Sequence, residues 1–422
     1  MTNTFYINGI IPQTINFNGA AVSSVYYNNV LVWSVTGGGE TPDEPYDDVL
    51  LKQPVTFTSP EPFSMDVPKY CSDYTCWNGT MEYSKDGGVS WTTWNGNTIT
   101  AALVDNEYKL SFRGTGNTHI AHRHLISYSY VECGVWRFQG SNIKCAGNIE
   151  NLLDYKIVAA GEHPVMDEDC FYRLFNECSA LTDASDLLLP ATTLAERCYS
   201  FMFIGCSNLI EAPELLPATT LKYECYRGMF YNCSSLTKVP KLSATILTES
   251  CCSIMFYNCT SLIEAPKLPA TILTYECYAG MFHNCSSLTK APELPAITLA
   301  ERCYATMFVG CSNLVEAPEL PATTLAESCY GYMFENCDNL ITLPSLSATI
   351  LPTRCYEGMF EGCTKIKISE TQTAECPNAY RIPSSGTITS YTAGQFGSFL
   401  EMFGTSITIE PNTTYYTNAA VI

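Results

Sequence analysis

Residues 189–215 read LPATTLAERCYSFMFIGCSNLIEAPEL, and residues 294–320 read LPAITLAERCYATMFVGCSNLVEAPEL, so the two stretches differ at 5 of 27 positions. Sixteen of the 22 cysteines mark the same unit as eight pairs, whose two members lie eight residues apart. Successive pairs settle to a step of 26 residues. The pairs are Cys170 and Cys178, Cys198 and Cys206, Cys225 and Cys233, Cys251 and Cys259, Cys277 and Cys285, Cys303 and Cys311, Cys329 and Cys337, and Cys355 and Cys363. This internal similarity indicates duplication of one short module.

The first half of each unit carries apolar residues at a spacing of four. In the quoted unit they are Leu194, Cys198, Met202 and Cys206. Residues four apart lie on one face of an α-helix, so the pattern predicts a short helix with a buried stripe. A capping box precedes the stripe in three units, and Gly or Asn follows it where a left-handed helix cap is expected. The boxes are Thr193 with Glu196, Thr298 with Glu301 and Thr324 with Glu327, and the cap column is Gly205, Asn232, Asn258, Asn284, Gly310, Asn336 and Gly362.

The second half of each unit, such as CSNLIEAPEL at 206–215, reads as a short strand with Leu209, Ala212 and Leu215 pointing inward. One short helix and one short strand cannot bury their own apolar face, so the units must stack into a solenoid. The predicted fold class is mixed α/β and all-β. It comprises about eight 26-residue strand–helix units at 161–370, preceded by an antiparallel β-sandwich and a small β-hairpin module.

The repeats resemble the BspA-like leucine-rich repeat family. The matching stretches are MFYNCSSL at 229–236, MFHNCSSL at 281–288 and their equivalents over about residues 165–370. The sequence departs from the family in having Met-Phe where Ala-Phe is usual, and in carrying Ala-Pro in the strand. The resemblance implies a leucine-rich-repeat solenoid and a role in adhesion.

The amino-terminal segment, residues 1–36, alternates as strands at 15–19 and 22–34, with Asn28-Asn29 as a hairpin turn. It resembles the small amino-terminal modules of bacteriophage structural and tail-associated proteins. That resemblance implies attachment to a virion. A linker rich in Gly, Pro and acidic residues follows at 37–48.

The segment at 49–160 carries short strand patterns separated by turn signals, which predict an antiparallel β-sandwich, immunoglobulin-like or related. Within it, SKDGGVSW at 84–91 resembles the Asp-box of sialidases and other β-propellers. The resemblance implies a structural hairpin turn in which Asp86 holds the loop and Trp91 packs beneath it. A single copy does not imply sialidase activity. Residues 371–422 are expected to cap the stack.

The paired cysteines have three interpretations. Within a unit, eight helical residues span about 12 Å, which exceeds the Cα separation of a disulfide. Bridges between neighbouring units would need cysteine side chains that run parallel, and zinc would need converging thiolates. We therefore expect reduced thiols that pack as small hydrophobic groups in two ladders. Whether Cys71, Cys76, Cys133 and Cys145 pair is left open.

The charge balance excludes one class of partner. The chain has 42 Asp and Glu against 22 Lys and Arg, a net charge of −20, so it lacks the positive charge that binding to nucleic acid requires. No run approaches 18 apolar residues, and the first residues lack the features of a secretory signal. We expect a soluble protein that is neither inserted in a membrane nor exported by the Sec route.

Catalytic residues are hard to find in this sequence. The five histidines are His119, His122, His124, His163 and His283. His122 and His124 would share one face of a strand and could bind a metal, but an exposed cluster is the simpler interpretation. No catalytic or phosphate-binding motif occurs. The sequence predicts no enzyme, no cofactor and no metal site.

Two residue columns are candidates for binding. Charged residues follow the inward Leu in successive units at Glu211, Lys238, Glu264, Lys290 and Glu316. Opposite charges thus alternate along the stack, which either fixes the register of the units or presents a surface that a ligand reads. Tyrosines recur at Tyr226, Tyr278, Tyr304 and Tyr330, with Tyr199 and Tyr356 at the ends. They form either a partly buried row or a surface that grips a sugar or a protein.

The predicted function is non-enzymatic recognition. The first hypothesis is a bacteriophage virion component, attached to other virion proteins by residues 1–36, whose repeats bind a host-surface protein or glycan. The alternative is a secreted or surface-exposed bacterial adhesin, and a carbohydrate-active enzyme is a remote third. Virion appendages are commonly symmetric homo-oligomers, so homo-oligomerisation is left open.

Overall fold

The computed structural model describes residues 15–17, 20–22, 24–27, 30–34, 48–67, 76–126, 129–341, 343–344, 346, 348, 350–369, 379–382 and 415–419. The chain divides into two compact units, residues 1–47 and 48–422.

The first unit contains two antiparallel strand pairs. Strand β1 (Ile15–Phe17) pairs with β2 (Ala20–Val22), and β3 (Ser24–Tyr27) pairs with β4 (Val30–Ser34). Tyr27 lies opposite Val30, so the connection between β3 and β4 is the two residues 28–29. The hairpin predicted at this position is confirmed.

The second unit begins with two sheets and two short helices. The larger sheet has the order β16-β15-β5-β11-β7-β8, with β10 on β11 and β17 on β15, and the smaller has the order β14-β6-β9. The bounds in the larger sheet are β5 (Val55–Ser59), β7 (Thr80–Ser84), β8 (Thr92–Trp94), β10 (Ala102–Val104), β11 (Glu107–Thr115), β15 (Ile143–Asn148), β16 (Leu181–Asp183) and β17 (Leu187–Leu188). The other elements are β6 (Ser64–Asp66), β9 (Ile99–Thr100), β14 (Arg137–Gln139), the hairpin of β12 (His122–Ile126) with β13 (Ser129–Cys133), and the helices α1 (Asp48–Leu51) and α2 (Asn151–Ala159). The predicted sheet-rich fold is confirmed.

The two sheets share an aromatic core. Burial alternates along β5, and Phe57 at its centre is fully buried. The Phe57 ring lies 4.7 Å from the ring of Phe138 in β14 and 5.8 Å from that of Trp136. Because β5 and β14 belong to different sheets, these contacts join the sheets through their side chains.

The turn between β7 and β8 has the structure that the Asp-box resemblance implies. Asp86 accepts hydrogen bonds from the Ser84 hydroxyl at 2.6 Å and from the Ser90 N–H at 2.9 Å. These bonds lower the pKa of Asp86 well below its usual range. The Trp91 indole donates to the Gly88 carbonyl at 3.0 Å, and the Arg113 guanidinium lies over its ring.

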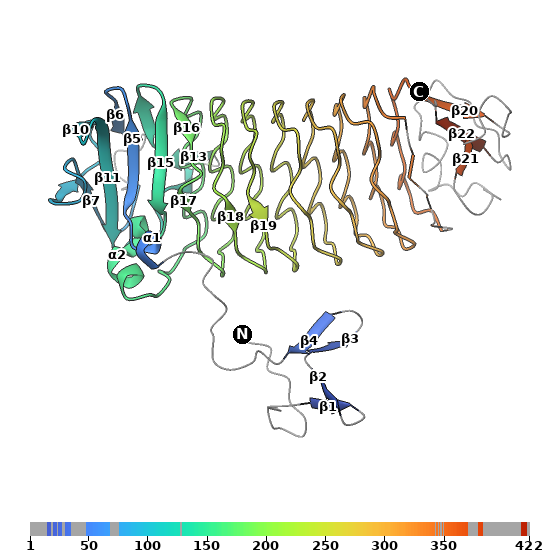
Figure 1. Ribbon diagram of the computed structural model, residues 1–422, viewed down its shortest axis with the longest axis horizontal. Coiled ribbons are helices and arrows are strands. Elements are labelled where there is room, and N and C mark those ends of the chain that lie inside the picture. The colour runs from blue at the N-terminus through green and yellow to red at the C-terminus, as the bar shows by residue number, and fades with distance from the viewer. Residues whose placement is uncertain are drawn as a thin grey trace. The chain divides into compact units, whose positions relative to one another are not determined.

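The larger sheet continues directly into the repeats. Strand β15 pairs antiparallel with β5 on one side and parallel with β16 and β17 on the other. The Ile143 N–H binds the Ala180 carbonyl at 2.9 Å, and the Gly147 N–H binds the Asp186 carbonyl at 3.0 Å. The sheet and its hydrophobic core therefore continue across the boundary expected between residues 160 and 161. Strand β15 covers the first coil of the repeats (Figure 1).

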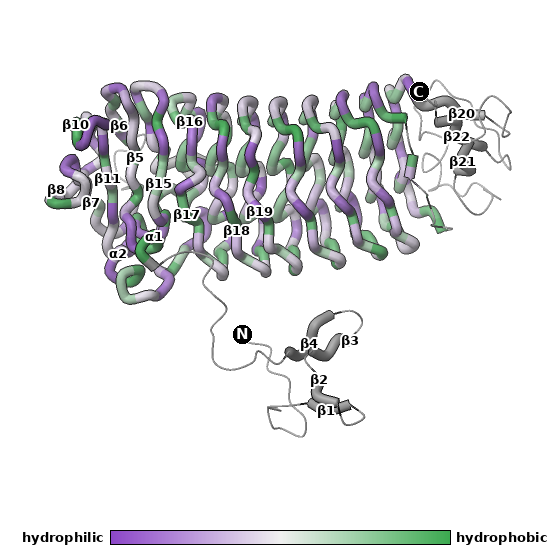
Figure 2. The backbone as a smooth tube through the Cα atoms, in the orientation of Figure 1, coloured by the Kyte–Doolittle hydropathy of each residue, from purple (hydrophilic) through white to green (hydrophobic). Residues whose placement is uncertain are grey.

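The repeats form coils that lie side by side, each joined to the next by parallel backbone pairing (Figure 1). Bridges link Glu211 with Lys238 and Glu264 with Lys290, and β18 (Leu215–Leu216) pairs with β19 (Lys241–Leu242). Hydrophobic and hydrophilic stretches alternate around every coil in Figure 2. The interior holds the Leu, Cys, Met and Phe columns, which are buried in every coil.

The predicted repeat helices are wrong. Within the described residues α1 and α2 are the only α-helices, and the cysteine segment of each coil is a series of turns. The Phe203 N–H binds the Met229 carbonyl of the next coil at 2.9 Å. The Met202 N–H instead binds back to Tyr199 at 3.2 Å. An α-helix would satisfy both groups internally, so this segment is not one.

The spacing of four arises from a repeated left-handed residue. In the second coil φ is positive at Arg197 (53°), Phe201 (54°) and Gly205 (71°), and the same columns are positive in later coils. The Gly and Asn column therefore has the predicted left-handed conformation, but it ends a turn and not a helix. Thr193 is exposed, and the capping box predicted with Glu196 has no helix to cap.

The carboxyl-terminal strands form a small antiparallel sheet of order β20-β22-β21. The strands are β20 (Ile366–Ser369), β21 (Ala379–Ile382) and β22 (Tyr415–Ala419). Strand β22 lies within the last ten residues of the chain. The rest of the predicted cap at 371–422 lies outside the described residues, as does most of the linker at 37–48.

Candidate functional site

One side of the repeats carries two parallel columns of charged side chains, which we call the charged face. The first column is Glu211, Lys238, Glu264, Lys290 and Glu316, and the second is Glu214, Lys241, Lys267, Glu293 and Glu319. Except for Glu211, which is half-buried, all are exposed. Leu209 and Ala212 point inward beside them, as the sequence predicts.

Ion pairs link neighbouring coils of the charged face, and one more joins the preceding sheet to the first coil. Lys238 lies 2.7 Å from Glu211, and Lys241 lies 3.0 Å from Glu214. One coil earlier, Lys144 of β15 lies 3.3 Å from Asp183. The first column therefore alternates in charge from coil to coil as predicted, whereas the second places Lys241 next to Lys267 and Glu293 next to Glu319. Pairs this exposed are each worth at most about 1 kcal/mol.

The local environment also ionises Asp183. Partial burial disfavours its charged form, but hydrogen bonds from Ser185 and the ammonium group of Lys144 outweigh that effect and lower its pKa. The carboxylate accepts from the Ser185 N–H at 2.9 Å and from the Ser185 hydroxyl at 2.7 Å. Asp183, which lies one coil before Glu211, thus carries a fixed negative charge.

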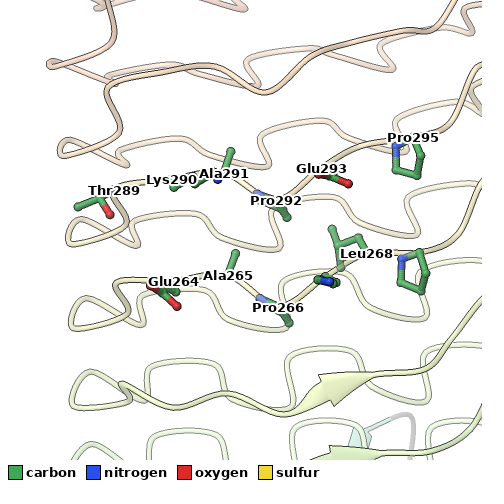
Figure 3. Close-up of a pocket in the computed structure, with 12 residues that line it drawn as sticks. Glu264, Ala265, Pro266, Leu268, Thr289, Lys290, Ala291, Pro292, Glu293 and Pro295 are labelled. Carbon is green, nitrogen blue, oxygen red and sulfur yellow. The ribbon is translucent and has the colours of Figure 1, made fainter.

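A groove of about 580 Å³ opens in the charged face between two adjacent coils (Figure 3). It is lined by residues 264–269 of one coil and by Thr289, Lys290, Ala291, Pro292, Glu293 and Pro295 of the next. Glu264 and Lys290 lie at one end and Glu293 lies further along (Figure 3), and Lys267 also lines the groove. The groove therefore combines two ammonium groups and two carboxylates with an apolar lining of Ala and Pro.

Proline removes one of the backbone contacts that join the earlier coils. Between β18 and β19 the Lys241 N–H binds the Glu214 carbonyl at 2.8 Å, and the Ser243 N–H binds the Leu216 carbonyl at 3.2 Å. The position of Ser243 is occupied in the next coils by Pro269 and Pro295, which have no N–H to donate. Beyond the bridge of Glu264 with Lys290, no backbone hydrogen bond joins the two segments within this described region.

The tyrosine column is not part of the surface. Tyr226, Tyr278, Tyr304 and Tyr330 are at most 2% exposed, so the structure corrects their assignment as binding residues. Their rings stack along the coils, with centroids 6.0 Å apart for Tyr278 and Tyr304. The tyrosines form a row inside the core, which was the other interpretation that the sequence left open.

The sixteen repeat cysteines are buried thiols, and they form two ladders as predicted. The second ladder makes a contact that the sequence did not show. Cys259 donates its S–H to the Phe230 carbonyl of the preceding coil at 3.2 Å, and six equivalent cysteines do the same. Burial raises the pKa of these thiols, to about 12 for Cys363. They are therefore poor nucleophiles.

Two of the histidines contact carboxylates that are not part of the charged face. His163 contacts the buried carboxylate of Glu150 at 2.8 Å, and His119 lies 3.5 Å from Asp167. His122 and His124 lie in β12, but their side chains are outside the described residues. Among the described side chains, no group of three His, Cys, Asp or Glu could hold a metal ion.

The structure brings together the charged-face residues named from the sequence. The sequence did not predict that Lys267, Glu293 and the second proline of each segment, Pro269 or Pro295, line the groove. The recurring pattern Ala-Pro-x-Leu-Pro, as at 265–269 and 291–295, is the signal that could have identified the groove. No helix among the described residues is long and apolar enough to span a membrane. Comparison with protein-family models, with curated proteins and with solved structures gave no match.

Proposed function

We propose that this protein is a non-enzymatic recognition protein that binds its ligand on the charged face of the repeats. The observation that carries the proposal is the groove between residues 264–269 and 289–295, where four charged side chains surround an apolar lining. Specific ligand sites combine apolar lining with a few placed polar groups in this way. The residues best suited to chemistry, the repeat thiols, face the interior.

We assign the stacked coils to a leucine-rich-repeat solenoid of the BspA-like type. The MFYNCSSL and MFHNCSSL stretches and the pairing of each coil with the next support the assignment. In this variant the expected helices are replaced by turns. Such stacks present long regular surfaces, which suits binding to a host-surface protein or glycan.

The proposed setting is a bacteriophage virion. The hairpins of residues 1–47, which form a compact unit of their own, would attach the protein to other virion proteins. The alternative is a bacterial surface adhesin. Genes for capsid, portal or tail proteins beside this gene would support the virion, and genes of an outer-membrane secretion system would support the adhesin.

The recognition proposal is tested with charge reversal in the full chain. Lys267→Glu combined with Lys290→Glu changes both ammonium groups of the groove, and Lys52→Glu is a matched control at an exposed site outside the repeats. Binding is first located with a glycan array and with host envelope fractions, and dissociation constants are then compared. We expect the groove variant to bind at least about tenfold more weakly. Equal binding by the variant and the control would mean that these charges only fix the register of the coils.

A further inference from the structure

A second exposed surface runs along the coils at the corner that follows the Ala-Pro segment. It consists of two adjacent columns in which all twelve residues are Thr or Ile, and we call it the Thr/Ile stripe. The residues are Thr192, Thr193, Thr219, Thr220, Thr245, Ile246, Thr271, Ile272, Ile297, Thr298, Thr323 and Thr324. The three capping boxes that the sequence indicated supply Thr193, Thr298 and Thr324 to this stripe. Because no helix follows these threonines, capping does not explain them.

The stripe is straight and regularly spaced. Parallel bridges join its second column without a break, from Thr193 through Thr220, Ile246, Ile272 and Thr298 to Thr324. Parallel strands lie about 4.8 Å apart, so equivalent side chains recur at that distance along the stack. Branched side chains at both columns keep this surface stiff.

The stripe exposes apolar groups that folding leaves uncovered. Ile246 is 57% exposed, Ile272 is 66% exposed and Ile297 is 60% exposed. Exposed apolar residues that lie singly need no explanation, but a contiguous row of them marks an interaction site. Pro269, Pro295 and Pro321 are also exposed and widen the row on one side.

We propose that the Thr/Ile stripe is the surface on which a second copy of this chain packs. Each chain carries a net charge of −20, so two copies repel unless they meet where charge is absent. The stripe meets that condition, whereas the charged face does not. With the stacks parallel, each coil meets the same coil of its neighbour. When the two-fold axis follows the second column, Ile246 and Ile272 pack on their own copies, and the hydroxyl of Thr298, which can both donate and accept, pairs with its copy.

The size of the stripe sets the expected strength of the interaction. One side of a standard interface uses about 20 to 30 residues, and the stripe with its flanking prolines supplies 15. We therefore expect a dissociation constant in the micromolar range, about 1 to 100 μM. This inference does not depend on the proposed recognition function, because none of the twelve Thr/Ile stripe residues lines the groove; only the flanking Pro269 and Pro295 belong to both surfaces.

Sedimentation equilibrium of the full chain from about 1 to 300 μM tests the proposal. The wild type should self-associate, and Ile272→Glu should raise the dissociation constant at least about a hundredfold, since it places two like charges opposite each other. Thr298→Lys is a second stripe variant that serves if Ile272→Glu does not fold. Ile263→Glu is the matched control, because Ile263 is 53% exposed beside the charged face.

Three results would overturn the proposal. The first is a wild-type chain that stays monomeric over the whole range, and the second is a folded stripe variant that associates as the wild type does. The third is loss of association in the Ile263→Glu control. Association that only the stripe variants lose supports the proposal, and their ligand binding should remain unchanged.

Discussion

The phenylalanine stack should be the most sensitive part of the repeat interior. Phe256 is fully buried, and its ring stacks on Phe230 at 5.6 Å and on Phe282 at 5.7 Å. Truncating a buried Phe to Ala typically costs 3–5 kcal/mol, and each aromatic pair is worth about 0.5–1.5 kcal/mol within that loss. Because Phe256 loses two partners, we expect Phe256→Ala to lower the free energy of unfolding by about 4 kcal/mol.

The neighbouring residue provides the control. Tyr257 is half-buried and stacks on Tyr231 at 4.6 Å and on His283 at 4.3 Å. Tyr257→Ala keeps the interior intact, so we expect a loss of about 1–1.5 kcal/mol. Phe256→Leu, which restores most of the volume, should fall near the same value.

Guanidinium unfolding followed by circular dichroism gives the free energies, and hydrogen exchange locates the damage. Stacked repeats interact mainly with their nearest neighbours, so lost protection should centre on the coils that carry Phe230, Phe256 and Phe282. The reasoning is refuted if Phe256→Ala costs no more than Tyr257→Ala, or if protection falls equally along all coils.

Three further predictions concern thiols, charge and backbone. All sixteen repeat thiols are buried, and burial raises the pKa of thiols such as that of Cys259, so iodoacetamide at pH 8 should leave the sixteen unmodified in the folded protein and alkylate them after unfolding. Mass spectrometry that shows disulfides or rapid labelling would contradict this. Burial and the Glu361 carboxylate raise the pKa of Glu335, so its ionisation costs stability as pH rises through that pKa. Glu335→Gln should stabilise the protein at pH 7 by less than about 1 kcal/mol, with no gain at pH 3.5, in paired melting curves. A Cβ at Gly358 (φ 56°) would lie 2.3 Å from the Tyr332 ring, whereas at Gly161 (φ 79°) it meets no atom within 4 Å. Gly358→Ala should therefore cost about 2–3 kcal/mol and Gly161→Ala about 1 kcal/mol, and equal losses would exclude the ring contact.

The interior of the repeats could be predicted from the sequence, but their backbone could not. Leu194, Cys198, Met202 and Cys206 are buried as the spacing indicates. A spacing of four fits an α-helix and also a run of four-residue turns. In an α-helix, residues four apart are rotated by only about 40° from each other around the helix axis, so the two patterns look alike over a short stretch. Over the three steps from Leu194 to Cys206 a helical stripe would rotate by about 120°. The column of Gly228, Gly280 and Gly358, all at positive φ, was the signal that favoured turns.

The candidate site was predicted in part for a similar reason. Alternating charges at Glu264 and Lys290 follow from the repeat, so the charged face could be predicted. The groove depends on whether backbone pairing continues past that column, and Pro295 removes one of the N–H donors that would continue it. Exposure could not be read from the tyrosines, since Tyr278 is apolar in its ring and polar at its tip.

The pairing of β15 with β16 has a consequence for how the chain is made. Synthesis runs from the amino terminus, so the sheet of β5, β11 and β15 can be complete while the repeats are still emerging from the ribosome. Each newly made coil can then pair with the folded coil that precedes it, so folding proceeds from the first coil to the last. A defect in an early coil should leave everything translated after it without a template, whereas the same defect in the last coil should cost little.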